Sequence, residues 1–374
     1  MSGGVDSSTV AGLLHELGHD VIGVTLQLYD HGAAIGRKGA CCAGQDIHDA
    51  RRVADHLGIP HYVIDAEKRF ADTVISDFAD SYAAGETPVP CVRCNQTVKF
   101  ADLTALAKGL GAERLATGHY ARRIDRPMGT ELHRAMDETR DQSWFLFATT
   151  CEQLALTVFP LGEMKDKRAV RAEAARLGLP LAEKPDSQDI CFVASGHYAD
   201  TVMRLRPDAG IPGNIVSRDG RVLGRHDGIA HYTVGQGRRL GQASVDRGRR
   251  QNVIALDAAQ CRVVVGPREI GTYRVRLRDL NWLVPPPSAA IKCDVKLRSR
   301  ELPHAATILD GGREVLLETP ALPAPGQSCV FYDGTRVLGG GFICRSDLAA
   351  MVDGTDGGGL SPLSSDLDGG VAQR

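Results

Sequence analysis

The 374-residue sequence contains no apolar run approaching the ~20 residues that a helix needs to cross a bilayer. It also has no N-terminal basic stretch followed by an apolar segment, which is the pattern of a secretory signal. Hydrophobic residues make up 43% and charged residues 24%, which excludes a mainly disordered, collagen-like or coiled-coil chain. We therefore expect a globular, cytoplasmic protein of roughly two or three domains, with no membrane partner.

The sequence also lacks a large net charge and a dense cysteine framework. Its formal charge of −2 gives no overall signal for a nucleic-acid partner, so any such signal must be local. The 10 cysteines are too sparse and irregular for the disulfide scaffold of a small secreted domain. In a reducing compartment they are thiols, metal ligands or catalytic groups.

Residues 10–121 alternate helical and strand patterns in the order that builds a parallel sheet. Helical stripes cover 10–17, 47–57 and 100–110, and strand-like runs cover 21–28, 61–65 and 114–117. Helices between strands imply right-handed crossovers. We therefore predict a doubly wound α/β domain over residues 1–200.

The remainder of the chain carries short strand-like runs, including 273–280, 290–297, 314–318 and 327–332, separated by turn signals. We predict an Arg-rich connecting domain over 201–272, a C-terminal β-barrel over 273–346 and a disordered, acidic, Gly-rich tail over 347–374. Residues 201–251 hold ten arginines against four aspartates, and residues 271–300 hold seven basic against two acidic side chains. Such a stripe suits a phosphate backbone, and an ordinary solvated surface is the alternative.

The strongest motif is Ser2-Gly3-Gly4-Val5-Asp6-Ser7-Ser8, directly before the first helical stripe. Two glycines let backbone amides turn toward an anion, the hydroxyls add donors, and the helix N-terminus contributes its positive end. The motif lacks the Gly-Lys-Ser/Thr of a Walker loop and the spacing of a dinucleotide fingerprint. It predicts a pyrophosphate cradle, and a flexible helix start capped by Asp6 or Ser7 is the alternative.

This heptapeptide resembles the PP-loop of the N-type ATP pyrophosphatases, which cleave ATP to AMP and pyrophosphate while adenylating a substrate. Further motifs follow in order: TPVPCVRCN at 87–95, KF at 99–100, ATGHY at 116–120, DQS at 141–143, DSQDICF at 186–192, HYTVGQ at 231–236 and PGQ at 325–327. Together they are similar to the tRNA-specific 2-thiouridylase family over almost the whole chain. The resemblance implies a PP-loop domain, a connecting domain that faces tRNA, and a β-barrel.

The resemblance implies ATP-dependent 2-thiolation of the wobble uridine of tRNA, with adenylation of the C2 carbonyl oxygen, replacement of that oxygen by sulfur, and release of AMP and pyrophosphate. The resemblance also implies ATP and Mg²⁺. It implies two partners, which are a tRNA with uridine at the wobble position and a persulfide sulfur-donor protein, and it does not imply DNA as a partner. The residues implied to hold the nucleotide are Met1, Ser2, Gly3, Gly4, Val5, Asp6, Ser7, Leu26 and Gly118. Of these, Val5 is expected to pack rather than to contact ATP.

Cys94 and Cys191 match the two catalytic cysteines of the family. The resemblance implies that Cys191 carries a persulfide whose terminal sulfur attacks the adenylated carbon. Cys94 is then the nucleophile that releases this sulfur, leaving a Cys94–Cys191 disulfide to be reduced. Each attack needs a thiolate, so we expect both thiols to be reachable and to have lowered pKa values. The alternative is that either is a small buried hydrophobe.

Cys91 stands where some family members carry an aspartate that is a candidate acid/base. Cys91, Cys94 and Cys191 together would be able to ligate three irons of a [4Fe-4S] cluster and leave the fourth iron open to sulfide. A complete structural zinc site would need a fourth ligand. Two routes therefore stay open: a cluster-dependent reaction, or persulfide and disulfide chemistry in which Cys91 substitutes for the acid/base.

The resemblance also places contacts with tRNA. These are Val89, Pro90 and Cys91 beside the target base, His119, the run Arg140, Asp141 and Gln142, and Arg298, Ser299 and Gln327 near the anticodon loop. Two other functions stay open. One is another PP-loop adenylating enzyme that acts on a small molecule, which would need neither the paired cysteines nor the basic C-terminal half. The other is a non-catalytic tRNA-binding protein that retains the fold.

One element expected from the motif is missing. A PP-loop normally follows a buried strand at the centre of the sheet, but Ser2 comes directly after Met1. Loss of a central strand would expose sheet edges and leave the loop unanchored. We therefore expect that the native start lies upstream or that this chain is compromised.

Overall fold

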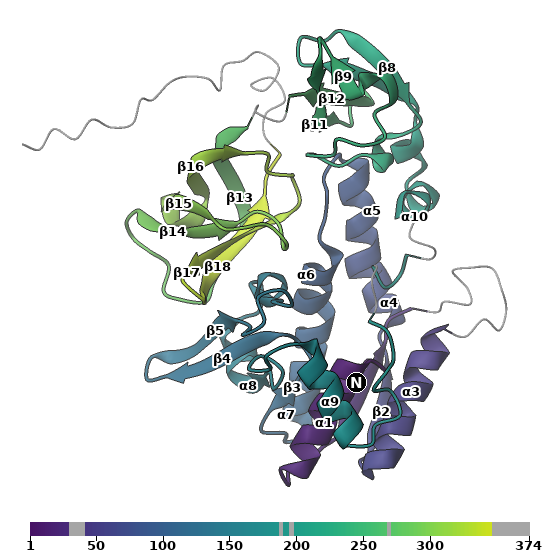
Figure 1. The fold of residues 1–374 in the computed structure, drawn as a ribbon, viewed down its shortest axis with the longest axis vertical. Helices are drawn as coiled ribbons and strands as arrows, with labels where there is room; N and C mark the ends of the chain where they lie inside the picture. The colour runs from purple at the N-terminus through teal and green to yellow at the C-terminus, as the bar shows by residue number, and fades with distance from the viewer. Residues whose placement is uncertain (30–41, 187–189, 194–197, 268–270, 346–374) are drawn as a thin grey trace, which may run out of the picture.

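The N-terminal part of the molecule is built on two short parallel sheets with helices against them (Figure 1). The computed structural model describes residues 1–29, 42–186, 190–193, 198–267 and 271–345, so the tail expected at 347–374 lies outside the described residues. Strand β1 (Gly23–Gln27) pairs with β2 (His61–Asp65), and β3 (Leu115–Ala116) pairs with β6 (Thr157–Val158), both in parallel.

The alternation of helices and strands that the sequence predicts is confirmed. Helices α1 (Val5–Glu16), α3 (Cys42–Leu57) and α7 (Phe100–Gly109) occupy the three helical stripes. Gly18 and Gly58 follow α1 and α3 with φ of 83° and 67°. This left-handed conformation, which a Cβ disfavours, ends each helix and turns the chain toward the next strand.

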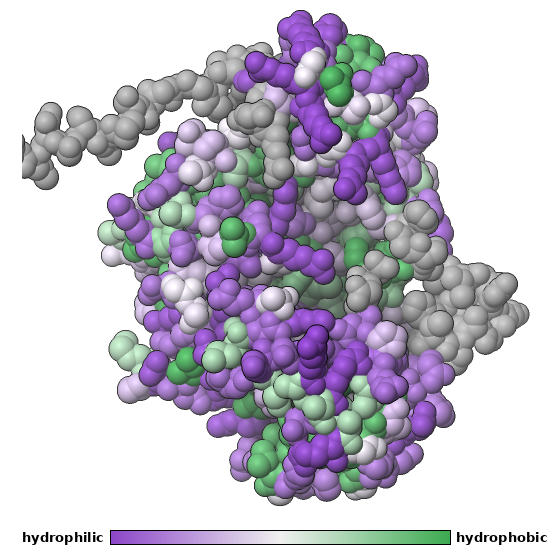
Figure 2. Space-filling model, in the orientation of Figure 1, coloured by the Kyte–Doolittle hydropathy of each residue, from purple (hydrophilic) through white to green (hydrophobic). Residues whose placement is uncertain are grey.

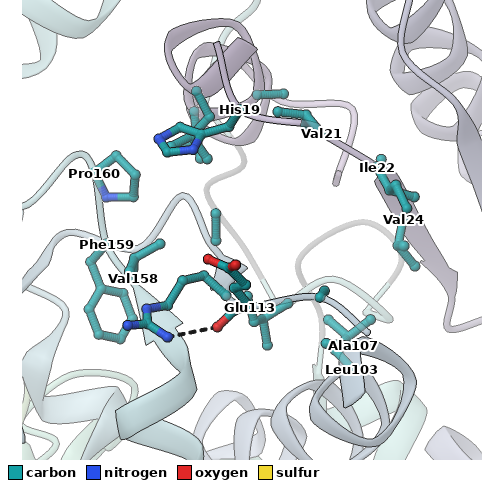
Figure 3. Close-up of a pocket in the computed structure, with 18 of the residues that line it drawn as sticks. His19, Val21, Ile22, Val24, Leu103, Ala107, Glu113, Val158, Phe159 and Pro160 are labelled. Carbon is teal, nitrogen blue, oxygen red and sulfur yellow. Dashed lines mark hydrogen bonds between the residues drawn. The ribbon is translucent and has the colours of Figure 1, made fainter. Parts of the chain in front are cut away.

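The two sheets are separated by a cavity of about 990 Å³ between β1 and β3. Apolar side chains from both sides line it, including Val24 of β1, Leu103 and Ala107 of α7, and Val158 of β6 (Figure 3). A buried parallel strand is covered by apolar side chains on both faces. The cavity, called the slot below, therefore has the place and the lining that the expected central strand would require.

A series of helical segments carries two of the motif cysteines. It comprises α4 (Glu67–Phe70), the π-helix η1 (Ala71–Ile75), α5 (Ser76–Ala83), α6 (Pro90–Cys94), the π-helix η2 (Asn95–Lys99) and then α7. Pro90 stands at the first position of α6, where its missing N–H costs no helical hydrogen bond. In η2 the Phe100 N–H bonds to the Asn95 carbonyl five residues earlier, and this wider turn brings Lys99 round to the side of Cys94.

The rest of the first domain supplies a hairpin and four further helical segments in the described residues. The hairpin is β4 (Ala121–Arg126) and β5 (Gly129–Arg134), and the helices are η3 (Ser143–Leu146), α8 (Cys151–Leu156), α9 (Lys167–Arg176) and α10 (Tyr198–Leu205). The Asp166 carboxylate caps α9 by accepting from the Ala169 N–H at 2.8 Å. Helix α9 packs against α1, as the ribbon shows (Figure 1).

The middle region is mostly β, as predicted. Its sheet has the order β11-β12-β7-β8, from β7 (Gly213–Ser217), β8 (Val222–His226), β11 (Asn252–Asp257) and β12 (Arg262–Gly266). A small ladder joins β9 (Val245–Asp246) to β10 (Arg249–Arg250), and short helices η5 (Pro207–Gly210), η6 (Ile229–His231) and η7 (Gly241–Ser244) complete it.

The C-terminal region forms a closed antiparallel barrel. Its strands are β13 (Thr272–Trp282), β14 (Ile291–Lys296), β15 (His304–Leu309), β16 (Glu314–Ala321), β17 (Ser328–Asp333) and β18 (Arg336–Ile343), with η8 (Asp310–Gly312) before β16. Pairing of β13 with β18 closes it. The sequence predicts four of these strands and misses β15 and β18.

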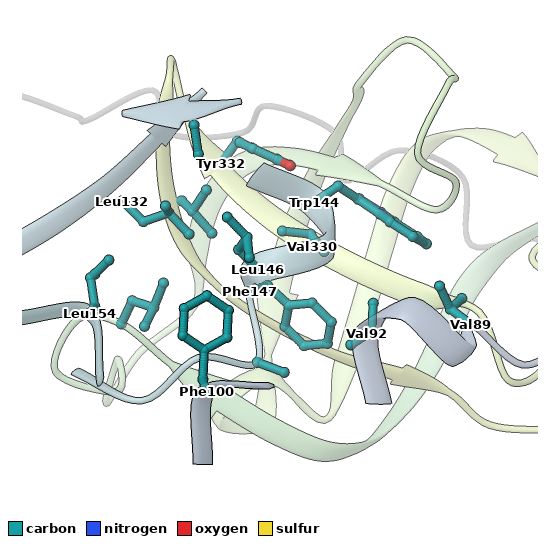
Figure 4. Close-up of a cluster of buried hydrophobic side chains, with 14 of the residues drawn as sticks. Val89, Val92, Phe100, Leu132, Trp144, Leu146, Phe147, Leu154, Val330 and Tyr332 are labelled. Carbon is teal, nitrogen blue, oxygen red and sulfur yellow. The ribbon is translucent and has the colours of Figure 1, made fainter. Parts of the chain in front are cut away.

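The barrel and the first domain share one hydrophobic core. Val92 of α6, Leu132 of β5 and Phe147 pack in the same buried cluster as Val330 and Tyr332 of β17 (Figure 4). The β5 edge also continues the barrel sheet through the His133–Arg336 pairing with β18. The barrel is therefore fixed against the helix that carries Cys91 and Cys94.

None of the described helices is long and apolar enough to cross a membrane.

Candidate active site

The PP-loop motif forms a tight turn into α1. Gly4 caps the helix without any side-chain hydrogen bond, so the first amides of α1 are not capped by a side chain. The hydroxyls of Ser2 and Ser7 lie 3.1 Å apart, and Ser7 also accepts from the Ser2 N–H at 3.0 Å. Gly3 has a φ of 68°, and a Cβ there would lie 2.2 Å from the Asp46 carbonyl oxygen. Amides and hydroxyls thus gather at one helix start, an arrangement that fits phosphate oxygens.

The ATGHY turn packs directly on this loop. A Cβ on Gly118 would lie 2.9 Å from the Ser7 nitrogen, so a side chain there would push the turn off the loop. Tyr120 donates its hydroxyl to Asp6 at 2.7 Å. The Thr25 hydroxyl donates to the Met1 carbonyl at 2.7 Å. The predicted nucleotide residues around the loop are therefore brought together.

Two residues of the nucleotide set face the protein interior. Val5 is 4% exposed and packs in a core cluster with residues of α9 and Tyr120, which is consistent with the expected packing role. Leu26 of β1 packs at the edge of the cluster that contains Cys94. Leu26 therefore contacts the cluster around Cys94.

The two motif cysteines are brought together across the fold. Cys94 and Phe192, the neighbour of Cys191, belong to one buried cluster. The Phe192 ring packs edge-on against Phe78, with ring centroids 5.2 Å apart. Lys99 interacts electrostatically with the thiols of Cys91, Cys94 and Cys191. One lysine therefore lies within the field of all three sulfur atoms.

The thiol pKa values contradict the expectation from the sequence. Burial raises the pKa of Cys94, and it raises the pKa of Cys191 to about 12, although Lys99 acts in the opposite direction on both. Cys91 and Cys191 are exposed as residues, but Cys94 is 5% exposed and not reachable from solvent. The prediction of lowered pKa values is contradicted for both thiols in this conformation, because burial disfavours the thiolate. The prediction of reachable thiols is contradicted for Cys94, whereas Cys191 is exposed.

A [4Fe-4S] cluster does not fit the described arrangement. Among the residues that the structure describes, no group of three His, Cys, Asp or Glu side chains is placed to hold a metal ion. Cys91 is exposed while Cys94 is buried, so the two thiols of the Cys-x-x-Cys pair differ in their access to solvent.

The residues expected beside the target base lie at the start of α6. Val89 and Pro90 are buried and Cys91 is exposed. His119 accepts or donates a hydrogen bond at Thr117 Oγ1 (2.9 Å) and stacks on Phe100, with ring centroids 6.0 Å apart. Burial and the charge of Lys99 lower the pKa of His119 to about 3. A neutral His119 is suited to hydrogen bonding rather than to an ionic phosphate contact.

The run 140–142 already has protein partners. Arg140 pairs with Asp186 at 2.7 Å. Asp141 accepts from the Ser143 N–H at 3.1 Å, which starts η3, and the Gln142 side chain accepts from the Tyr120 N–H at 3.1 Å. Asp141 and Gln142 thus hold the local backbone.

The predicted residues of the barrel also have partners in the protein. Arg298 donates to the carbonyls of Val234 and Leu322, both at 3.1 Å, and so joins the middle region to the barrel. The Ser299 carbonyl accepts from Lys296 at 2.8 Å. Gln327 donates to the Thr87 carbonyl at 2.9 Å, four residues before Cys91.

Sequence reasoning missed lysines that face the site, among them Lys99 and Lys167. Lys99 lies within the KF motif, so the sequence marked the residue. It did not show which groups interact with the charge of Lys99. Lys167 has no such signal, yet its Nζ lies 2.7 Å from Asp6 and 2.8 Å from Asp186. Only the packing of α9 on α1 brings Lys167 to the loop.

Three family models match the chain in succession. They are described as the tRNA methyl transferase HUP domain at residues 1–195, the tRNA methyl transferase PRC-barrel domain at 200–267 and the aminomethyltransferase beta-barrel domain at 272–343. Together they span the α/β part, the middle sheet and the barrel.

Curated relatives are similar over nearly the full length. The tRNA-specific 2-thiouridylase MnmA of Acidiphilium cryptum is 68% identical over 343 residues, which cover 92% of this chain and 98% of that protein. The protein of the same name in Gluconobacter oxydans is 59% identical over 355 residues, covering 93% and 98%. Among solved structures, NMN synthetase from Francisella tularensis matches with a TM-score of 0.33 at 16% identity, over 56% of this chain and 82% of that one.

Proposed function

The chain belongs to the tRNA-specific 2-thiouridylase family, and from that premise we propose that it is an ATP-dependent tRNA-uridine 2-sulfurtransferase that acts on the wobble position. The observation that carries this proposal is that one turn connects the PP-loop to the surroundings of the motif cysteines. The turn at 117–120 packs on the PP-loop through Gly118, while His119 of the same turn lies in the field of Lys99 beside the thiols.

The first step is adenylation of the uridine. A lone pair of the uridine O2 attacks the α-phosphorus of ATP, the bond from that phosphorus to the bridging oxygen breaks, and its electron pair leaves with pyrophosphate. The uncapped amides of α1 and the hydroxyls of Ser2 and Ser7 would hold the phosphates, with Mg²⁺ bound to them. Adenylation matters because an oxide is a poor leaving group and AMP is a good one.

The second step transfers sulfur. The terminal sulfur of a Cys191 persulfide, supplied by a donor protein, attacks C2, and AMP leaves with the electron pair of the C2–O bond. The Cys94 thiolate then attacks Cys191 Sγ, which breaks the S–S bond and leaves its electron pair on the sulfur that stays on C2. A Cys94–Cys191 disulfide remains, and an external dithiol reduces it by two electrons. Because burial raises the pKa of the Cys94 thiol, a base must remove its proton before it attacks Cys191 Sγ, and the exposed Cys91 is the group that we propose as this base.

The proposed partner is a tRNA with uridine at the wobble position. The proposal therefore includes a cytoplasmic location for the protein. Exposed arginines of the middle region, among them Arg249 and Arg250 on β10, suit its phosphate backbone. Hydrophilic side chains cover most of the face in Figure 2, including the part where β8 and β9 lie, and this face is hollowed near its middle. Contacts of Val89, Pro90, Cys91 and His119 with the base remain part of this proposal.

The test is nucleoside mass spectrometry of a wobble-uridine tRNA incubated anaerobically with the protein, ATP, Mg²⁺ and a persulfide donor. We expect 2-thiouridine that is absent without ATP. Cys191→Ser should abolish the product and still bind tRNA, whereas Cys151→Ser, which removes an exposed thiol outside the motifs, should not change it. Retained thiolation in Cys191→Ser would contradict the persulfide role.

Three further outcomes separate the alternatives. Activity that depends on iron and sulfide in anaerobically purified protein would replace the persulfide route by a cluster route. ATP cleavage to AMP and pyrophosphate without any need for tRNA would favour an adenylating enzyme of small molecules. Absence of ATP cleavage together with tight tRNA binding would favour the non-catalytic function.

A further inference from the structure

The PP-loop holds no cation of its own. Between Met1 and Ser8 the only charged side chain is that of Asp6, which is acidic. Pyrophosphate gains negative charge as it leaves, and a positive group is most useful where that charge develops. Besides the Mg²⁺ expected on the phosphates, a cationic side chain at this point must therefore come from another part of the chain.

Two lysines reach the loop, and their surroundings differ. Lys184 donates to the Gly3 carbonyl at 2.8 Å and to Asp46 and Asp49, both at 2.7 Å. These three acceptors use all three N–H groups of its ammonium. Lys184 therefore acts as a structural cross-link beneath the loop.

The ammonium of Lys167 has fewer hydrogen-bond partners than it has N–H groups. Its Nζ contacts Asp6 at 2.7 Å and Asp186 at 2.8 Å, and within the described part of the chain these are its two hydrogen-bond or ion-pair partners. A third N–H is therefore available to a ligand. Its side chain is only 11% exposed, so its charge is less screened by water than a surface charge.

The position of Lys167 joins two helix starts. Lys167 is the first residue of α9 and Asp6 is the second residue of α1, so their contact brings the positive ends of both helices together beside the loop. Arg140 also faces this point through Asp186, at 2.7 Å. The Asp186 carboxylate therefore lies next to several cations. An anionic ligand would favour the same position.

We propose that Lys167 is the cationic residue of the pyrophosphate subsite: its ammonium binds the β- and γ-phosphate oxygens of ATP and stabilises the charge on the departing pyrophosphate. The inference rests on the proposed function and adds a residue to the adenylation step. No bond to Lys167 forms or breaks. Asp6 holds the ammonium at the loop, and the phosphates replace Asp186 as its second partner.

The test compares Lys167→Met with the unmodified chain. The variant should fold, because Asp6 keeps the Tyr120 hydroxyl at 2.7 Å and Asp186 keeps Arg140 at 2.7 Å, so neither carboxylate is left unpaired. Calorimetric titration with pyrophosphate alone should show binding weakened about tenfold. Pyrophosphate release in the presence of ATP and tRNA should slow by about 100-fold, the typical cost of losing one charge-stabilising group. Binding of tRNA should be unchanged.

Two variants on the same helix sharpen the comparison. Arg176→Met removes an exposed ion pair with Glu16 (2.5 Å) at the far end of α9 and should leave pyrophosphate binding unchanged. Lys167→Arg keeps the charge and should regain most of the affinity. Unchanged pyrophosphate binding in Lys167→Met would overturn the proposal.

Asp186→Asn separates a ligand-binding role from a structural one. It removes a partner of the ammonium but keeps the ammonium, so pyrophosphate binding should be retained or tighter. Equal losses of pyrophosphate affinity in Asp186→Asn and Lys167→Met would show a merely structural network and overturn the proposal. If the unmodified chain forms no 2-thiouridine while Lys167→Met still weakens pyrophosphate binding, the proposed function fails and the subsite stands.

Discussion

At the scale of single residues, close backbone approach explains the glycines of the site better than flexibility does. Gly3 lies against the Asp46 carbonyl and Gly118 against the Ser7 nitrogen, at distances that no Cβ tolerates. The first contact seats the loop on α3, and the second seats the ATGHY turn on the loop. Both glycines therefore fix the distance between the nucleotide loop and its surroundings.

The raised pKa of Cys191 predicts how its thiol responds to pH. A thiol with a pKa of about 12 keeps its proton at neutral pH, and its thiolate fraction grows about tenfold for each pH unit up to that value. Alkylation of Cys191 by iodoacetamide should therefore rise about tenfold per unit from pH 7 to pH 10. Mass spectrometry of the Cys191 peptide measures the rate.

A free thiol such as glutathione is the control for this measurement, because its alkylation levels off above a pH of about 8.5 to 9. A plateau of the Cys191 rate in the same range would show that the surrounding protein does not hold the proton. The raised pKa would then be contradicted.

At the scale of secondary-structure elements, the π-helix η2 decides how the cysteines meet Lys99. The sequence predicts a helix from residue 100, and the structure shows a continuous helical run from Pro90 with a wide turn after Cys94. Such turns occur often at functional sites, since they rotate a side chain out of the regular helical pattern. Periodicity alone cannot detect a single inserted residue.

The slot between β1 and β3 predicts that an added strand stabilises the chain. Fusion of a five-residue apolar, β-branched segment directly before Met1 should pair with both free sheet edges and fill the cavity of about 990 Å³. We expect the midpoint of thermal unfolding to rise by roughly 5–10 °C, measured by calorimetry. Amides of β1 and β3 should also exchange more slowly with solvent.

A Gly/Ser extension of equal length is the matched control, because it offers the same backbone but no apolar side chains to the slot. It should leave the unfolding midpoint close to that of the original chain. Equal effects of the two extensions, or no effect of either, would contradict the interpretation of the slot as a strand position.

At the scale of the whole molecule, the barrel packs against helix α6 of the first domain, which carries Cys91 and Cys94. The Thr87 N–H donates to the Pro325 carbonyl at 2.7 Å, and Gln327 returns a bond to the Thr87 carbonyl. Arg278 of β13 pairs with Glu86 at 2.6 Å. The segment that leads into Cys91 is thus held by barrel residues far along the chain.

Loosening this support should slow sulfur transfer without affecting nucleotide binding. In a Glu86→Gln/Gln327→Ala double variant we expect the rate of 2-thiouridine formation at saturating substrates to fall roughly tenfold, because small displacements of reacting groups are costly. The dissociation constant of ATP should stay the same, since the loop makes none of these contacts. Mass spectrometry and calorimetry measure the two quantities.

Arg274→Met is the matched control for the double variant. It removes an ion pair with Glu314 at 2.7 Å that lies within the barrel and does not touch the first domain. Equal thiolation rates in the double variant and in this control would show that the barrel does not position the cysteine helix.

The sequence by itself determined the α/β alternation, the loop chemistry before α1 and the identity of the motif cysteines. Each of these depends on local information: hydrophobic period, glycine, capping residues and short motifs. The tertiary structure alone decided that Cys94 is buried, that Lys167 meets Asp6, and that Arg298 links the middle region to the barrel. These properties depend on burial and on contacts between residues far apart in the chain, and no local pattern encodes them.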